Sequence, residues 1–238
     1  MINRDVFGNI LFIKRFLIWI IGNISYKRFR GINHLIIQGS EIISSLPDTN
    51  VLFISNHQTY FADATAMLHV FNASLNGRYN SLKNSSYLNK PKLNIYYVAA
   101  KETMNSGIIP KILSYTGAIS ISRTWRNKNE NIDRPVNLDD VGNISKALKN
   151  GWLITFPQGT TKPFSPIRKG TAHIIMNNKP IVVPIIIDGF RRSFDKTGLR
   201  IKKKGIQQSM RIMDPVKFDY KKDSIETITE KIAASIGQ

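Results

Sequence analysis

The chain has no cysteine among its 238 residues. This absence excludes disulfide bonds, thiolate nucleophiles and cysteine-ligated zinc, and it fits a reducing cytoplasm. Acidic residues are also scarce, because 16 Asp and Glu stand against 34 Lys and Arg, which gives a formal charge of +18. Such an imbalance favours a polyanionic partner, either nucleic acid or an anionic membrane surface.

The N-terminal region lacks an apolar run long enough to cross a membrane. Residues 6–24 are mostly apolar, but Lys14 and Arg15 interrupt them and leave only residues 16–21 unbroken. A membrane-spanning helix needs about 20 apolar residues. The run is also short for the core of a signal peptide. We therefore predict that this segment does not span a bilayer.

The same segment has the character of a helix at a membrane surface. On a helical wheel it has one narrow polar stripe, formed by Arg4, Gly8, Arg15 and Gly22. Apolar side chains fill most of the remaining circumference, and three basic residues follow, Lys27, Arg28 and Arg30. We predict that residues 1–30 associate with anionic membrane lipids, while residues 31–238 form the main domain. The alternative is a helix that packs against the domain's own core.

Strands and helices alternate along the rest of the chain, and no linker or repeat divides it. We expect strands at residues 35–37, 51–55, 95–99, 118–122, 152–156 and 181–187, and helices at residues 62–71, 108–115, 138–149, 170–177 and 225–236. This alternation predicts a single α/β domain with a mixed sheet flanked by helices. Residues 72–94 are polar, and a loop of that length is expected to be functional or disordered.

A histidine and an aspartate follow the predicted strand at residues 51–55. His57 stands just after the strand, and Asp63 stands at the start of the next helix. A neutral histidine can act as a general base, and a nearby carboxylate can hold its tautomer and stabilise the imidazolium. The simpler alternative is a polar loop residue beside a helix cap.

Cationic residues also follow predicted strands. Lys101 and Arg123 each follow one, and residues 156–170 follow another with three further cations, Lys162, Arg168 and Lys169. Ligands of open α/β sheets bind beyond the carboxyl ends of the strands. A base and several cations are therefore expected to converge at one edge, where they suit an anionic substrate.

Five segments, taken in order, resemble the glycerolipid acyltransferase family. They are NHQTYFAD at 56–63, AAKET at 99–103, GAISISR at 117–123, FPQGTTKPFSPIRKG at 156–170 and VVPIII at 182–187. The best-known members of this family acylate 1-acylglycerol-3-phosphate to phosphatidic acid. The resemblance implies that His57 takes the proton of the acceptor hydroxyl, which attacks the thioester of acyl-CoA or acyl-carrier protein. It also implies that Asp63 orients His57, without a covalent acyl-enzyme and without a metal or other cofactor.

The resemblance assigns substrate-binding residues as well. Arg123 and Lys101 would bind the acidic group of the acceptor. Gln158, Gly159 and Thr160 would line the acceptor pocket, and Pro184 would shape the acyl or thioester channel.

Three departures from the family pattern bear on these assignments. Five residues separate His57 from Asp63 where the family has four, so the extra residue must lie in the turn before the helix. Gln158 stands where the family has Glu, and an amide cannot act as a carboxylate. Thr161 stands where the family has Arg, which removes a bidentate phosphate contact. The candidate replacements are Lys162, Arg168 and Lys169.

These observations predict a 1-acylglycerol-3-phosphate O-acyltransferase of phospholipid biosynthesis at the cytoplasmic face of the inner (plasma) membrane. Its expected partners are anionic membrane lipids, a lysophospholipid acceptor, and acyl-CoA or acyl-carrier protein. The basic residues between 191 and 204 would face the membrane or an acidic carrier protein, and no nucleic-acid module is present. One alternative is O-acylation of a lyso-ornithine or lyso-glycine lipid. Another is a catalytically inactive, basic lipid-binding protein.

Overall fold

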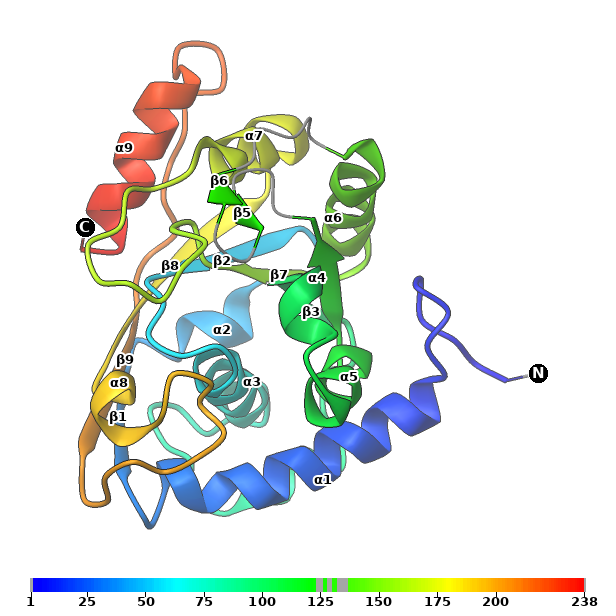
Figure 1. The fold of residues 1–238 in the computed structure, drawn as a ribbon, viewed down its shortest axis with the longest axis vertical. Helices are drawn as coiled ribbons and strands as arrows, with labels where there is room; N and C mark the ends of the chain where they lie inside the picture. The colour runs from blue at the N-terminus through cyan, green and yellow to red at the C-terminus, as the bar shows by residue number, and fades with distance from the viewer. Residues whose placement is uncertain (1, 123–125, 128–129, 132–136, 238) are drawn as a thin grey trace.

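A seven-stranded sheet forms the centre of the molecule in the computed structural model, which describes residues 2–122, 126–127, 130–131 and 137–237 (Figure 1). The strand order is β1-β9-β8-β2-β7-β3-β4. The strands are β1 (His34–Gln38), β2 (Val51–Ser55), β3 (Ile95–Ala100), β4 (Ala118–Ile121), β7 (Trp152–Thr155), β8 (Ile181–Asp188) and β9 (Gln207–Ile212). All neighbours pair in parallel except β8 and β9, which are antiparallel, so the sheet is mixed as predicted. A small separate ribbon pairs β5 (Arg126–Asn127) with β6 (Glu130–Asn131).

Helices cover both faces of the sheet in an α/β domain (Figure 1). One face is covered by α1 (Leu11–Phe29), α2 (Ile42–Ser45) and α3 (Ala62–Leu75), and the other by α6 (Leu138–Asn150), α7 (Lys169–Asn178) and α9 (Ile225–Ser235). Shorter helices connect these layers: η1 (Ser85–Asn89), α4 (Lys101–Met104), α5 (Ile108–Tyr115) and α8 (Phe190–Ser193).

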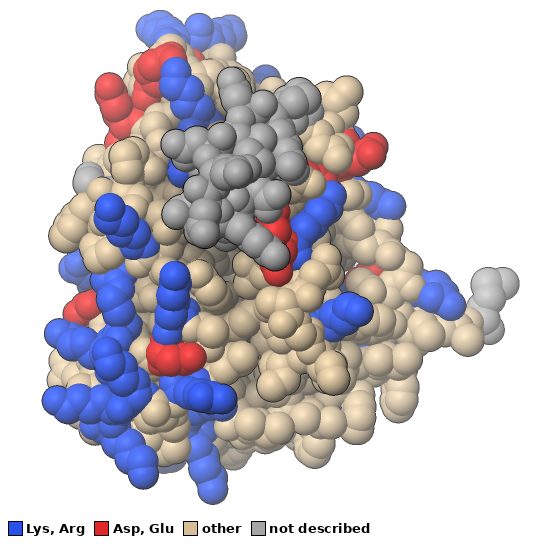
Figure 2. All heavy atoms as spheres, in the orientation of Figure 1, with Lys and Arg blue, Asp and Glu red and all other residues tan. Residues whose placement is uncertain are grey.

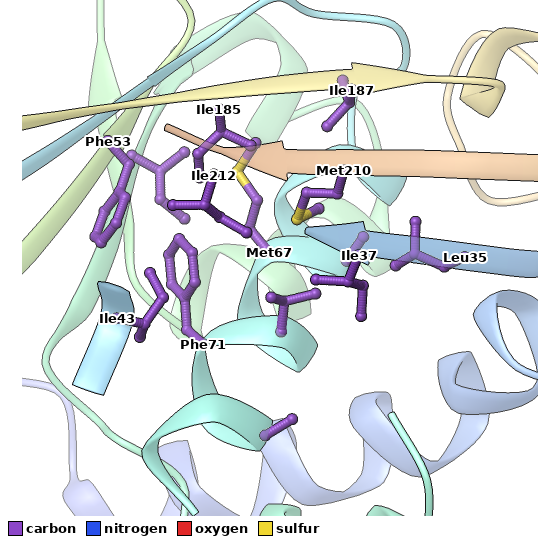
Figure 3. Packing of buried hydrophobic residues seen from close by; sticks show 14 of the residues in the cluster. Leu35, Ile37, Ile43, Phe53, Met67, Phe71, Ile185, Ile187, Met210 and Ile212 are labelled. Carbon is purple, nitrogen blue, oxygen red and sulfur yellow. The ribbon is translucent and has the colours of Figure 1, made fainter. Parts of the chain in front are cut away.

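The central strands explain the two layers. Every residue of β2 is buried, and its side chains alternate between the two faces of the sheet. Val51 and Phe53 join the cluster under α3, whereas Leu52 and Ile54 join the cluster under α6, α7 and α9. Figure 3 shows the first cluster, where Phe53 lies beside Phe71 and side chains of β1, β8 and β9 complete the packing.

Residues 72–94 correct an expectation. They do not form a single long loop, because α3 continues to Leu75 and η1 follows at Ser85–Asn89. Leu82, Tyr87 and Leu88 are buried in the main core cluster. The segment therefore supports α1 and α3 from outside, and its polar composition conceals a few apolar anchors.

The N-terminal helix begins at Leu11 and packs against the body along one face. The buried residues on that face are Lys14, Ile18, Gly22, Ser25 and Phe29. The predicted polar stripe is therefore wrong, because Gly22 faces inward. A Cβ at Gly22 would lie 2.8 Å from two terminal carbons of Leu88, so a larger residue here would require the Leu88 side chain to move. Among the described residues, no helix combines the length and apolar character needed to cross a bilayer.

Lys14 is buried instead of interrupting an apolar surface. Its Nζ lies 3.0 Å from Asp5 Oδ2 and 4.6 Å from the centre of the Tyr96 ring. Burial lowers the pKa of Lys14, and the contact with Asp5 opposes that shift. The backbone N–H of Ile10 donates to Tyr115 Oη at 2.8 Å. These contacts attach the start of α1 to the rest of the domain.

Acid is expected to destabilise the protein through His69, which lies buried between Ser25 of α1 and Tyr87 of η1. Burial lowers the pKa of His69 to about 4. The pKa of a histidine in an unfolded chain is about 6.5. Between these pH values the unfolded chain binds a proton that the folded chain does not. The free energy of unfolding should therefore fall by roughly 3 kcal/mol as the pH drops through this window, and stay unaffected above it.

Urea unfolding between pH 4 and about pH 7 measures this effect. A His69→Gln variant should show a shallower pH dependence than wild type, because it lacks the titrating group. His173→Gln is the matched control, since His173 is exposed on α7. Equal pH slopes for wild type and His69→Gln would contradict the prediction.

Candidate active site

The site lies at the carboxyl edge of the central strands. In the sheet, Ile54 of β2 is level with both Thr155 of β7 and Pro184 of β8, and all three strands run in parallel. The segments that leave these strands, residues 56–63, 156–170 and 188–193, therefore begin at the same edge. Residues 56–63 and 156–170 were expected to converge, and residues 188–193 begin at the same edge.

His57 and Asp63 form a hydrogen-bonded pair. His57 Nδ1 lies 2.9 Å from Asp63 Oδ2, and the side chains are 12% and 0% exposed. Asp63 Oδ2 also accepts the backbone N–H groups of Gln58 (2.6 Å) and Thr59 (3.0 Å), and Oδ1 accepts the Thr59 hydroxyl at 2.6 Å. A carboxylate can only accept a hydrogen bond, so Nδ1 of His57 carries the proton that joins the pair. In the neutral ring the lone pair then lies on Nε2.

The extra residue between His57 and Asp63 does not separate the pair. Helix α3 begins at Ala62, so the added length lies in the turn before the helix. Tyr60 N–H donates to Lys196 O at 3.1 Å, and Phe61 N–H donates to Thr197 O at 2.9 Å. The loop that follows α8 therefore holds the longer turn in place through its backbone carbonyls.

The ring of His57 is fixed from both sides. Its plane stacks on Phe156, with ring centres 3.9 Å apart and an angle of 18°. The hydrogen bond from Nδ1 to Asp63 fixes the edge of the ring, so that the ring cannot turn within its own plane. Within the described part of the chain, Nε2 has no hydrogen-bond partner. This nitrogen is therefore available to a substrate hydroxyl.

Both sequence neighbours of His57 are attached to the end of β8. The amide of Asn56 exchanges two hydrogen bonds with the backbone of Ile187, each 2.9 Å long. Gln58 Nε2 donates to Ile187 O and to Asp188 Oδ1, both at 3.2 Å. The side-chain amides of Asn56 and Gln58 thus fix the position of His57 by hydrogen-bonding to the end of β8.

The segment after β7 forms a tight loop beside the histidine. Gly159 has a φ of +64°, a conformation that favours glycine, and its N–H donates to Phe156 O at 2.9 Å. Gln158 is buried, and its Nε2 donates to Ser165 O at 3.0 Å, so this amide braces the loop. Thr160 Oγ1 accepts the N–H of Lys162 at 3.3 Å.

The predicted cations lie in different surroundings. Lys101 Nζ contacts Asp140 Oδ1 at 3.2 Å and Ser122 Oγ at 3.0 Å, which holds it near the end of β4. Lys169 is directed towards α9, where it pairs with Glu226 at 2.6 Å. The structure does not bring Lys169 to His57.

The other predicted residues lie on the loop after β7, inside β8 or outside the described part of the chain. Lys162 is exposed on the loop, and the backbone N–H of Arg168 donates to Pro157 O at 3.0 Å. Arg123 lies outside the described residues. Pro184 is buried inside β8, opposite Ile54 of β2.

Arg191 is a site residue that the sequence-based interpretation missed. It lies on α8, and its Nη2 donates to Thr161 O at 2.8 Å and lies 3.5 Å from His57 O. The available signal was its position just after a predicted strand, which Lys101 and Arg123 share. Arg191 also begins the basic stretch at residues 191–204, and it was therefore assigned with that stretch to the membrane or a carrier protein instead of to the site.

An apolar cavity adjoins the turn between His57 and Asp63. It lies between α1, α3 and α5, and its lining includes Ile18, Ile21, Tyr60, Phe61, Leu68 and Leu113. Tyr60 and Phe61 belong to the turn between His57 and Asp63, so the cavity reaches the immediate surroundings of the pair.

Comparisons with known proteins identify the family of the chain. Residues 34–188 match the model of the Acyltransferase family, and the chain belongs to that family, the glycerolipid acyltransferases. It is 28% identical over 103 residues to 1-acyl-sn-glycerol-3-phosphate acyltransferase of Cocos nucifera, a match that covers 41% of this chain and 33% of that relative. The chain thus aligns with one third of the length of this curated relative.

The fold is similar to that of a solved bacterial structure. The crystal structure of the 1-acyl-sn-glycerophosphate (LPA) acyltransferase PlsC from Thermotoga maritima superposes with a TM-score of 0.59 and 19% identity. The match covers 94% of this chain and 77% of that one. Nearly the whole chain therefore shares the α/β architecture of that protein.

Gly198 is predicted to be necessary for the geometry of the catalytic turn. Its φ is +79°, and a Cβ there would lie 2.6 Å from Ala62 N and 2.9 Å from Thr59 Oγ1. Gly198→Ala should displace the turn that holds Asp63, and lower the rate of acyl transfer by roughly 10- to 100-fold. Steady-state kinetics measure this, with Gly205→Ala as control. Gly205 has a similar φ of +71°, but nothing lies within 4 Å of its added Cβ. Equal rates for the two variants would contradict the assignment.

Proposed function

We propose that the protein transfers an acyl chain from acyl-CoA or acyl-carrier protein to the free hydroxyl of 1-acylglycerol-3-phosphate, which forms phosphatidic acid. The observation that carries this proposal is the His57–Asp63 pair at 2.9 Å, with Nε2 open to an acceptor. Membership of the acyltransferase family supports the reaction class. The similarity to enzymes named for 1-acyl-glycerophosphate supports the choice of acceptor.

The reaction follows from the geometry of the pair. His57 Nε2 accepts the proton of the acceptor hydroxyl while its oxygen attacks the thioester carbonyl. Asp63 stabilises the resulting imidazolium through Nδ1. When the tetrahedral intermediate collapses, the carbon–sulfur bond breaks and the proton passes from His57 to the leaving thiolate. The products are phosphatidic acid and a free thiol, and the histidine returns to its starting state.

Each substrate has a suitable region beside the pair. We assign the acyl chain to the apolar cavity between α1, α3 and α5, because its walls are mainly aliphatic and aromatic; at about 40 Å³ this cavity must widen to admit the chain. Lys101 is partly exposed at the carboxyl edge of β3, where it suits the acidic group of the acceptor together with Arg123. Gly159 and Thr160 contribute the backbone of the neighbouring loop.

The proposed location is the cytoplasmic face of the inner membrane, with anionic lipids as partners. The outer side of α1 exposes large apolar side chains, including Phe12 (77% exposed), Phe16 and Trp19. Helix α5 contacts α1 and exposes Ile108 (78%), Ile109 and Ile112. Helices with such exposed apolar faces bind in the plane of the membrane interface.

Basic side chains adjoin this apolar face. Exposed Lys and Arg residues at the end of α1 and in the loop after α8 form a group that we call the basic rim: Lys27, Arg30, Lys196, Arg200, Lys202, Lys203 and Lys204. The two parts of the rim are neighbours, because Arg28 Nη1 donates to Gly198 O at 3.4 Å. Figure 2 shows Lys and Arg gathered over α8, the loop after it and the adjoining end of α1, beside a largely uncharged area over α1 and α5. Apolar insertion and attraction to anionic headgroups would act together on this side.

The reaction is tested with purified protein, 1-acylglycerol-3-phosphate and each acyl donor, with products identified by mass. Wild type should form phosphatidic acid. His57→Ala should lower kcat by about 10²–10⁴-fold while the protein stays folded, because the general base is lost. His173→Ala is the matched control, as His173 is exposed on α7. Undiminished turnover by His57→Ala would overturn the mechanism. Product from a lyso-aminolipid alone would overturn the acceptor.

Membrane association is tested by sedimentation with phosphatidylglycerol vesicles and phosphatidylcholine vesicles. Wild type should prefer the anionic vesicles and bind less tightly at high salt. Replacing Ile108 and Ile112 together by Ser should weaken binding by at least about tenfold, because apolar insertion is lost. The control is Leu138→Ser, since Leu138 is equally exposed but lies on α6. Equal losses for the two variants would contradict the proposed surface.

A further inference from the structure

Arg191 connects the two segments that carry the proposed chemistry. It follows β8 closely on α8, and its guanidinium contacts the backbone carbonyls of Thr161 (2.8 Å) and His57 (3.5 Å). A cationic group therefore lies directly between the histidine and the loop after β7. None of the family segments identified in the sequence includes this residue.

The backbone of Arg191 is held by the neighbour of His57. The N–H of Arg191 donates to Gln58 Oε1 at 3.0 Å, while Gln58 Nε2 donates to Ile187 O at 3.2 Å. The start of α8 therefore has a defined position relative to the catalytic turn. A guanidinium carried by this short helix is prepositioned, which reduces the entropy lost on binding a ligand.

The charge of Arg191 is available for a ligand. The side chain is exposed, and among the described residues Nε and Nη1 have no hydrogen-bond partner and no carboxylate forms an ion pair with it. The nearby carboxylate of Asp188 pairs instead with Arg192 Nη2 at 3.0 Å, and it also accepts from Gln58. Arginine offers five N–H donors in a planar fork that matches phosphate oxygens.

The position of Arg191 resolves one departure from the family pattern. Thr161 stands where related sequences have an arginine, and Arg191 Nη2 donates to the carbonyl of Thr161 itself. Of the expected replacements, Lys169 fits less well, since it pairs with Glu226 on α9. A guanidinium from α8 thus lies beside the point from which the missing one would extend.

We propose that Arg191 binds the phosphate of the lysolipid acceptor beside His57, in place of an arginine at position 161. This inference rests on the proposed function and adds a specificity-determining residue to it. Two N–H groups of the guanidinium would bind phosphate oxygens, while Nη2 retains its contact with Thr161. An acceptor with an anionic headgroup would then be favoured over an uncharged monoacylglycerol.

The test compares Arg191→Gln with Arg192→Gln, using short-chain, water-soluble 1-acylglycerol-3-phosphate so that membrane binding does not limit the rate. Arg191→Gln should raise the KM for this acceptor by about 10- to 100-fold, with kcat within about threefold of wild type. Arg192→Gln is the matched control, adjacent on α8, and should change KM by less than about twofold. With uncharged monoacylglycerol, Arg191→Gln should leave kcat/KM unchanged.

Two further variants separate phosphate binding from simple bracing of the loop. Thr161→Arg in the Arg191→Gln background should lower the KM again towards the wild-type value, because it places an arginine at the position where related sequences have one. Arg191→Lys should retain part of the affinity, since a charge without the bidentate fork remains. A loss of kcat that is equal for charged and uncharged acceptors would overturn the proposal, and so would an unchanged KM.

Failure of the proposed reaction would be recognised separately. If wild type forms no phosphatidic acid with either donor, the reaction is wrong, and calorimetric binding of the short-chain acceptor to wild type and Arg191→Gln decides the inference. Weaker binding by Arg191→Gln alone supports the phosphate contact. Equal binding by both overturns it. Circular dichroism establishes that each variant is folded, and Arg191→Lys replaces Arg191→Gln if the latter is not.

Discussion

The buried carboxylate of Asp63 is the constraint on which the site depends. A charge without solvent is costly unless hydrogen bonds replace its water, and here four donors do so. Three of the four come from Gln58 and Thr59, so satisfying the carboxylate also shapes the turn between β2 and α3. The fourth is the ring of His57. The folding requirement of one group thus sets the orientation of the other.

The same logic extends outward from the turn. Asn56 and Gln58 attach it to β8, and the carbonyls of Lys196 and Thr197 attach its second half to the loop after α8. Segments from the first and last thirds of the chain therefore meet at the turn between His57 and Asp63. The sheet makes this possible, since β2 lies between β7 and β8 and all three strands end at the same edge.

Much of this arrangement could be predicted from the sequence, because it depends on local patterns. Strands that are apolar over most of their length, such as β2, are readily predicted to be buried, and the His–Asp spacing stands beside this one. Strand β9 was missed because four of the six residues of Gln207–Ile212 are polar, and the segment becomes a strand by pairing with β1 and β8. The role of η1 was missed because two buried residues, Tyr87 and Leu88, are surrounded by polar ones. Arg191 and Thr161 are thirty residues apart, and only the placement of α8 brings them together.

The loop after α8 holds the turn between β2 and α3 through its main chain and directs its basic side chains to solvent. A carbonyl is supplied by any amino acid, so the contacts to Tyr60 and Phe61 place no demand on the identity of residues 196 and 197. The shape of the loop depends on two other residues: Gly198 has no room for a side chain, and the Asp195 carboxylate accepts from Thr197, Gly198, Leu199 and Arg200. The exposed basic residues can therefore vary without disturbing the carbonyls that hold the turn, whereas Asp195 and Gly198 cannot.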